Sequence, residues 1–193
     1  MTTLSDNVEV KNKIKSELYQ CILEMPYKKI TVKMLVARLG MSRQNLYRYY
    51  VSKDEILLDM LDSTLETTYQ IVELNLKEFE SNVEMVVLNI QDMIGGKREL
   101  INDIMFASNE ALVFSHLKSF VRRVVGRILR EGDYTSIDHD YMDVVISQYT
   151  GSGFYLLKEW AQSSGDVSPE KLRKSMVVYI ESLFQAVYDN AHR

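Results

Sequence analysis

The chain has 193 residues, 46% of them hydrophobic, and carries a net charge of −4. That length accommodates one ordinary domain, or a small domain joined to a larger one, and excludes a large multidomain protein. The negative total excludes a globally basic nucleic-acid-binding protein of the histone type. Residues 8–53 nevertheless hold ten Lys or Arg and three Glu, a local net charge of +7. A basic segment on an acidic chain indicates an interaction head attached to a larger body.

The single cysteine, Cys21, cannot form an intramolecular disulfide or a thiolate metal cluster. The first residues lack the order of a signal peptide, and no apolar run reaches the roughly 18 residues of a membrane span. We therefore expect a cytoplasmic protein. Two prolines, eight glycines and apolar residues at three- and four-residue steps predict an all-α protein.

The first predicted helix spans residues 7–25, and Cys21 lies on its apolar side, where we expect it to be buried. After this helix, Thr31, Ser42 and Ser52 are each placed to cap the N-terminus of a further helix. Each cap is flanked by two apolar residues in the pattern of a hydrophobic staple. The pairs are Ile30 with Leu35, Met41 with Leu46, and Val51 with Ile56.

The spacing of these caps predicts two short helices and the start of a longer one, with Gly40 in the first turn. This is the pattern of a helix-turn-helix. Leu46 and Tyr50 would anchor the second short helix, which leaves an outward face rich in Arg, Gln, Asn and Tyr. Such side chains read base edges and bind phosphates in a major groove. A solvated polar face is the alternative, which the staples, the turn and the local charge disfavour.

The sequence from Ile30 to Leu57, ITVKMLVARLGMSRQNLYRYYVSKDEIL, resembles the DNA-binding head of the TetR family of bacterial transcriptional regulators. The resemblance covers roughly residues 10–60. It consists of a Thr-capped helix, Ala and Gly before the turn, a Ser-capped recognition helix ending in Leu-Tyr-x-aromatic-aromatic, and a Ser-Lys-x-Glu start to the next helix. Tyr50 stands where the family usually has Phe, and Gln44-Asn45 replaces the more common Gly-Thr or Gly-Asn.

The resemblance implies which side chains contact DNA. Thr31 and Lys53 would hold phosphates, and Ser42 and Tyr47 would brace the recognition helix on the DNA backbone. The residues that would face the groove are Arg43, Gln44, Arg48 and Tyr49, with Asn45 also on the outward face. A cation in the first turn of a helix, as at Lys53, opposes the helix dipole, and a nearby phosphate would remove that conflict.

The remaining sequence predicts helices near residues 52–75, 82–94, 98–107, 109–130, 137–163 and 169–190. Ser168 and Pro169 mark the start of the last one. This divides the chain into a DNA-binding domain of residues 1–52 and a helical effector-binding and dimerisation domain of residues 53–193. Residues 149–160 resemble, weakly, a TetR subgroup that includes activators of dihydroxyacetone utilisation.

Two further sites are predicted in the larger domain. Adaptable Met and flat aromatic side chains favour an apolar ligand pocket, with ordinary core packing as the alternative. The pocket candidates are Met93, Met105, Phe106, Phe114, Tyr149, Gly153 and Phe154. A broad apolar stripe in the last two helices favours a homodimer interface. The interface candidates are Trp160, Leu172, Met176, Ile180, Leu183, Phe184 and Val187.

Together these patterns predict a dimeric DNA-binding transcriptional regulator, a repressor that a small molecule releases from a palindromic operator. A TetR-like activator, or a regulator controlled by a corepressor or partner protein, is the alternative. No enzyme, cofactor or metal is expected, because the sequence lacks the motifs of catalytic sites and His116 and His139 have no second His or Cys at helical spacing. A helical adaptor with a basic protein-binding head is a third possibility, which competition by a DNA palindrome would separate.

Overall fold

A computed structural model of the chain describes residues 4–75, 87–88, 102, 110–131, 138–162 and 168–191. The helices that they form are α1 (Leu4–Glu24), the 3-10 turn η1 (Tyr27–Lys29), α2 (Val32–Leu39), α3 (Arg43–Leu46), α4 (Lys53–Asn75), α7 (Glu110–Glu131), α8 (His139–Gln162) and α9 (Pro169–Ala191). These ranges contain no strand, and the predicted all-α class is confirmed. The helices predicted at 82–94 and 98–107 lie almost entirely outside the described residues.

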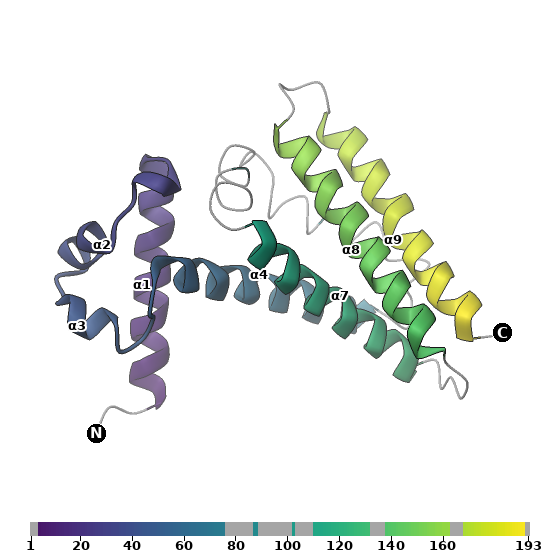
Figure 1. The fold of residues 1–193 in the computed structure, drawn as a ribbon, viewed down its shortest axis with the longest axis horizontal. Helices are drawn as coiled ribbons and strands as arrows, with labels where there is room; N and C mark the ends of the chain where they lie inside the picture. Colours follow the sequence, from purple (N-terminus) through teal and green to yellow (C-terminus); the bar gives the residue numbers. More distant parts are fainter. Residues whose placement is uncertain are drawn as a thin grey trace.

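The helices form a small head and a larger body (Figure 1). The head consists of α1, η1, α2 and α3, and α4 runs from it to the body, where α4 packs on α7. The helices α8 and α9 are antiparallel neighbours, and both contact α7. Because α4 belongs to both parts, any displacement of α4 in the body is passed to the head.

The three predicted helix caps are present and explain where the helices of the head begin. In each case a side-chain oxygen accepts a hydrogen bond from a backbone N–H group of the first turn, which the helix itself leaves unpaired. The donors and distances are Met34 to Thr31 at 3.3 Å, Asn45 to Ser42 at 3.1 Å, and Glu55 to Ser52 at 3.1 Å. The caps therefore fix α2, α3 and α4 at the predicted positions.

The turn between α2 and α3 depends on Gly40, whose φ of +64° lies in the left-handed region that side chains disfavour. The N–H of Met41 donates to the carbonyl of Val36 at 3.0 Å, which closes the end of α2. The prediction of a third hydrophobic staple is wrong, because the Val51 side chain is 77% exposed. Its N–H instead donates to the Glu55 carboxylate at 2.6 Å, so this helix start is held by polar contacts.

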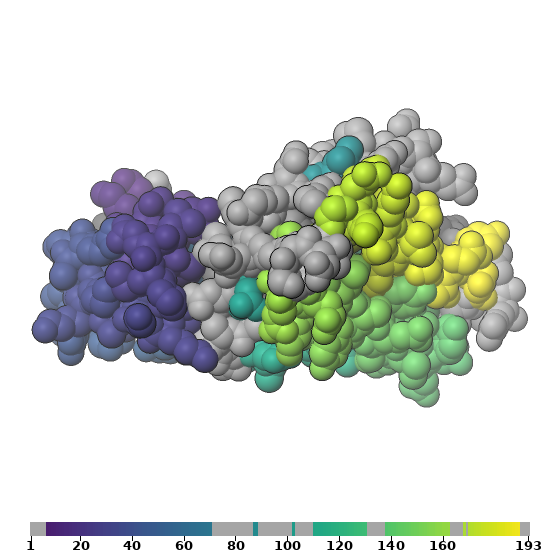
Figure 2. All heavy atoms as spheres, turned by 90° about the horizontal axis from the view of Figure 1, so that it is seen from above, coloured from purple at the N-terminus to yellow at the C-terminus, as the bar shows by residue number. Residues whose placement is uncertain are grey.

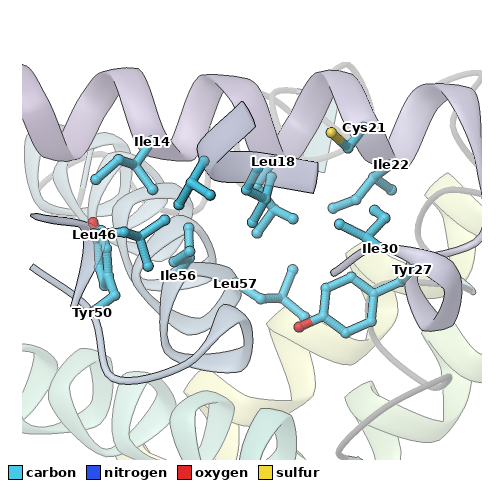
Figure 3. Packing of buried hydrophobic residues seen from close by; sticks show 12 residues of the cluster. Ile14, Leu18, Cys21, Ile22, Tyr27, Ile30, Leu46, Tyr50, Ile56 and Leu57 are labelled. Carbon is cyan, nitrogen blue, oxygen red and sulfur yellow. The ribbon is translucent and has the colours of Figure 1, made fainter. Parts of the chain in front are cut away.

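A single hydrophobic core holds the head together (Figure 3). It contains Cys21 on α1, as predicted, and burial raises the pKa of that thiol. The buried members are Ile14, Leu18, Cys21, Ile22, Tyr27, Ile30, Leu35, Val36, Leu46, Tyr50, Ile56 and Leu57. Ile56 and Leu57 belong to α4, so the core of the head extends beyond the boundary predicted between residues 52 and 53.

The apolar residues predicted to form the dimer interface pack in the core of the body, so the stripe itself is no evidence for a dimer. Trp160, Leu172, Met176, Leu183 and Val187 are buried within one chain, and Ile180 and Phe184 pack partly buried against the same clusters. A single chain covers this stripe because α9 packs on α7 as well as on α8. The exposed apolar side chains of α8 and α9 are different residues: Tyr141, Val144, Tyr155, Val178 and Tyr188.

Gly153 allows α8 and α9 to approach closely. An added Cβ at Gly153 would lie 2.7 Å from the hydroxyl oxygen of Tyr179 and 2.9 Å from its Cζ. The Tyr179 hydroxyl donates to the carbonyl of Tyr149 at 2.7 Å, and the Tyr149 hydroxyl donates to the carbonyl of Ser182 at 2.7 Å. The space beside Gly153 is therefore filled by a tyrosine of the same chain.

Alanine substitution at the two glycines of α8 is expected to change stability in opposite directions. Gly153→Ala should displace Tyr179, at a cost of about 1–3 kcal/mol that exceeds the helix-propensity gain of about 1 kcal/mol. Gly151→Ala is the matched control, because its Cβ would meet nothing within 4 Å and only the propensity gain applies. Urea unfolding of both variants measures the difference, and equal stability would contradict the close approach.

Candidate DNA-binding site

The helix α3 presents most of its polar side chains to solvent. Leu46 and, after the helix, Tyr50 are buried in the head core, which fixes the direction of the opposite face. Arg43 and Gln44 on that face are exposed, as is Arg48 in the turn after α3, and no side-chain bond or ion pair to them occurs within the part of the chain that the structure describes. Their hydrogen-bonding groups are therefore available to a ligand that enters from outside.

The other predicted contact residues differ in accessibility. Tyr47 is half exposed, whereas Asn45 is partly buried and the Tyr49 ring packs against the head core. The hydroxyls of Thr31 and Ser42 lie at the N-termini of α2 and α3, where they accept the capping hydrogen bonds. All of these remain predicted DNA contacts, and the packing of the Tyr49 ring on the core reduces the surface that it can offer to a groove.

The structure divides the ten cations of the basic segment into two groups. Four have partners within the head: Lys11 lies over the Tyr50 ring, Lys15 pairs with Asp59, Arg38 pairs with Glu17 and Glu24, and Lys53 is bound by carbonyl groups. The other six are exposed and make no side-chain bond to any described residue: Lys13, Lys28, Lys29, Lys33, Arg43 and Arg48. This second group can neutralise phosphates without first giving up a partner in the described chain.

Lys28, Lys29 and Lys33 are candidate phosphate contacts that motif reasoning missed. Lys28 and Lys29 lie in η1, and Lys33 lies in the first turn of α2 beside the Thr31 cap. A helix N-terminus with nearby cations is a favourable place for a phosphate. The signal was present in the sequence as local charge, but the charge alone does not tell an exposed lysine from one that is bound internally.

Lys53, a predicted phosphate contact, has internal partners. Its ammonium donates to the carbonyls of Tyr27 at 2.8 Å and Ile30 at 2.9 Å, and it lies 4.0 Å from the centroid of the Tyr27 ring. These carbonyls and the ring stabilise the Lys53 ammonium without DNA. They therefore explain why a cation is tolerated in the first turn of α4, where the helix dipole opposes it. A phosphate contact by Lys53 stays a prediction, and it would have to share the ammonium with these carbonyls.

Two buried tyrosines of the head donate hydrogen bonds to aspartates of α4. Tyr27 donates to Asp54 at 2.5 Å, and Tyr50 donates to Asp59 at 2.5 Å. Burial raises the pKa of both hydroxyls above the ordinary tyrosine value, and the bonded aspartates raise it further. Tyrosine is already protonated at neutral pH, and the raised pKa keeps both hydroxyls as donors in alkaline solution as well.

Residues 19–60 match the family model for bacterial regulatory proteins of the tetR family. Over these residues the head is therefore similar to that of tetR-family proteins. The chain is also similar to the nucleoid occlusion factor SlmA of Shewanella sediminis (strain HAW-EB3), with 25% identity over 142 residues. That similarity covers 64% of this chain and 72% of the relative. The matched residues contain the end of α1, η1, α2, α3 and the start of α4.

Of the predicted ligand-pocket residues, the four that the structure describes have different neighbours. Phe114 and Phe154 contact each other edge to face between α7 and α8, with ring centroids 5.5 Å apart. Tyr149 and Gly153 instead contact Tyr179 on α9. Met93, Met105 and Phe106 lie outside the described residues. The pocket stays a prediction, and Gly153 supplies room for Tyr179 and not for a ligand.

Two observations concern the sequence predictions about His116 and about membrane-spanning segments. His116 lies 2.6 Å from the Asp62 carboxylate, a contact that joins α7 to α4. Across the described ranges, no helix has both the length and the apolar composition needed to cross a bilayer.

Proposed function

We propose that this protein is a transcriptional regulator that inserts α3 into the major groove of a palindromic operator. The proposal depends on one observation: Arg43 and Gln44 on the capped helix α3, and Arg48 in the turn after it, are exposed and make no side-chain bond within the described chain. A buried core supports them from behind. Arg and Gln pair bidentately with guanine and adenine. The similarity of the head to tetR-family proteins supports the same binding mode.

We further propose that two copies bind together as a homodimer. The exposed apolar residues of α8 and α9 are the surface that supports it, since Val144 is 62% and Val178 64% exposed. Figure 2 shows the head at one end of the molecule and the α8 and α9 surface beyond it. A pair joined through α8 and α9 would thus leave both heads free, with recognition helices spaced about 34–36 Å apart on successive major grooves.

Regulation is proposed to act through a small molecule that binds the body and releases a repressor from DNA. A ligand achieves this by binding better to the conformation with the wrong head spacing. Control by a corepressor or a partner protein is the second candidate. The tyrosine that fills the space beside Gly153 favours the partner protein, because a small molecule of either kind would need a volume that this position of α8 does not offer. In both cases the DNA-binding surface is the same.

Selection from a pool of randomised DNA duplexes tests the proposed function. The full chain is expected to enrich a palindrome whose half-sites lie about 10–10.5 base pairs apart, or a multiple of that spacing. Arg43→Ala should relax the preference at one position per half-site by about 1–3 kcal/mol. Lys33→Ala should weaken binding to all duplexes alike and reduce the salt slope by roughly one unit.

The two variants control for each other, because one concerns base recognition and the other phosphate contact. A chain that binds the pool without enriching any sequence would contradict the regulator and favour a non-specific basic head. Enrichment that Arg43→Ala leaves unchanged would show that α3 does not read the bases.

A further inference from the structure

Both ends of the helix-turn-helix segment are attached to α4 through a tyrosine hydroxyl. Tyr27 precedes α2 and Tyr50 follows α3, and both side chains are buried in the head core. Their acceptors, Asp54 and Asp59, lie within the first two turns of α4. Residues 28–49, which include all of α2 and α3, are thus held between two hydrogen bonds to one helix.

Each attachment also contains a cation. At the first, Lys53 binds the carbonyls of Tyr27 and Ile30 and lies over the Tyr27 ring. At the second, Lys15 lies 3.6 Å from the Asp59 carboxylate and donates to Ser63 at 2.9 Å. The Asp59 carboxylate is therefore compensated by Lys15, and at both attachments a hydrogen bond to a charged acceptor is among the stronger kinds.

The hydroxyls are not needed to fill the core. Phenylalanine occupies almost the same volume as tyrosine, so a ring without the hydroxyl would fill the same space. What tyrosine adds is a donor with a fixed direction, which finds its acceptor 9 residues further along the chain. A directional bond at each end opposes both sliding and rotation of the segment on α4, whereas apolar packing alone is non-directional.

We propose that Tyr27 and Tyr50 are positioning residues for DNA recognition, because their hydroxyls fix the segment of α2 and α3 in one orientation on α4. This inference rests on the proposed DNA-binding function. It makes α4 and the two recognition elements one rigid unit, so that the body sets the direction of the groove-facing side chains through α4.

Hydrogen exchange of the full chain tests the attachment without DNA. In Tyr27→Phe and Tyr50→Phe, the amides of α2 and α3 are expected to exchange about tenfold faster than in the wild type, while those of α7 to α9 keep their rates. Tyr69→Phe is the matched control. Tyr69 lies on α4 and packs against the body core, and its hydroxyl makes no hydrogen bond to a described residue. Removal of that hydroxyl should therefore leave the exchange rates of α2 and α3 unchanged.

DNA binding tests the positioning role. The probes are a duplex that the wild type selects from a randomised pool and an unrelated duplex of equal length, at a temperature where every variant is folded. Each Tyr→Phe variant should bind the selected duplex about tenfold more weakly and the unrelated duplex with little change. A hydroxyl that only stabilised the fold would leave both affinities unaltered. Asp59→Asn, which keeps an oxygen acceptor, should bind closer to the wild type than Asp59→Ala.

Three outcomes decide against parts of the proposal. Unchanged exchange in α2 and α3 in both Tyr→Phe variants would overturn the attachment. Faster exchange with an unaltered ratio of the two duplex affinities would overturn the positioning role and leave a stabilising one. If the wild type selects no duplex, the proposed function and the positioning role both fail, while the exchange rates still decide whether the attachment exists.

Discussion

A Val178→Glu chain is expected to be a folded monomer that binds its selected duplex about 10²- to 10⁴-fold more weakly than the wild type. Val178 is exposed on α9, so the charge should not disturb the core of one chain, but it would be buried without a partner in the proposed dimer. One head alone then loses the benefit of the second attachment. Sedimentation gives the mass, and a DNA titration gives the affinity.

Two controls identify the surface that is responsible. Leu112→Glu places the same charge on α7, at another exposed apolar residue, and should leave the dimer intact. Leu183→Glu introduces the charge into the core of a single chain and should unfold the body. A Val178→Glu protein that sediments as a dimer would move the interface away from this part of α9.

The second large effect is expected at Leu46, where alanine should destabilise the head by about 2–5 kcal/mol. Leu46 is fully buried and anchors α3, a helix of four residues that has too few internal hydrogen bonds to be stable alone. Loss of this contact should unfold α3 and remove sequence-specific binding at temperatures where the body remains helical. Circular dichroism during urea unfolding measures the loss.

Val51→Ala provides the matched control, because Val51 also follows α3 closely in sequence but is mostly exposed. Its truncation should change stability by no more than about 0.5 kcal/mol. Equal losses in the two variants would mean that α3 is not held by its buried leucine.

The sequence was most informative where local chemistry decides the structure. The caps at Thr31, Ser42 and Ser52 act on backbone groups three residues away, so the pattern alone locates the helix starts. The last helix likewise begins as predicted at Pro169, behind the Ser168 cap. Helical periodicity also identified Cys21, Leu46 and Tyr50 as buried.

The contacts that could not be predicted join residues far apart in the sequence. Periodicity shows that a face of α9 is apolar, but it does not show whether another helix or another chain covers it. The space beside Gly153 depends on Tyr179, and the environment of Lys53 depends on carbonyls 23 and 26 residues earlier. For the same reason, the sequence could count the ten cations of the head but could not separate the four with partners from the six that bond to no described side chain.

The use of α4 by the head limits how this protein can be recombined with others. A head transplanted at residue 52 would lack Ile56 and Leu57 and both aspartate acceptors, whereas one that ends after Ser63 would carry the complete core and its polar attachments. The junction then lies within a continuous helix. One inserted residue would turn the new body by about 100° relative to the head, whereas seven would restore its facing to within about 20° and move it about 10 Å away. The phase of the helix at the junction therefore decides whether two transplanted heads can still reach the same side of a DNA duplex.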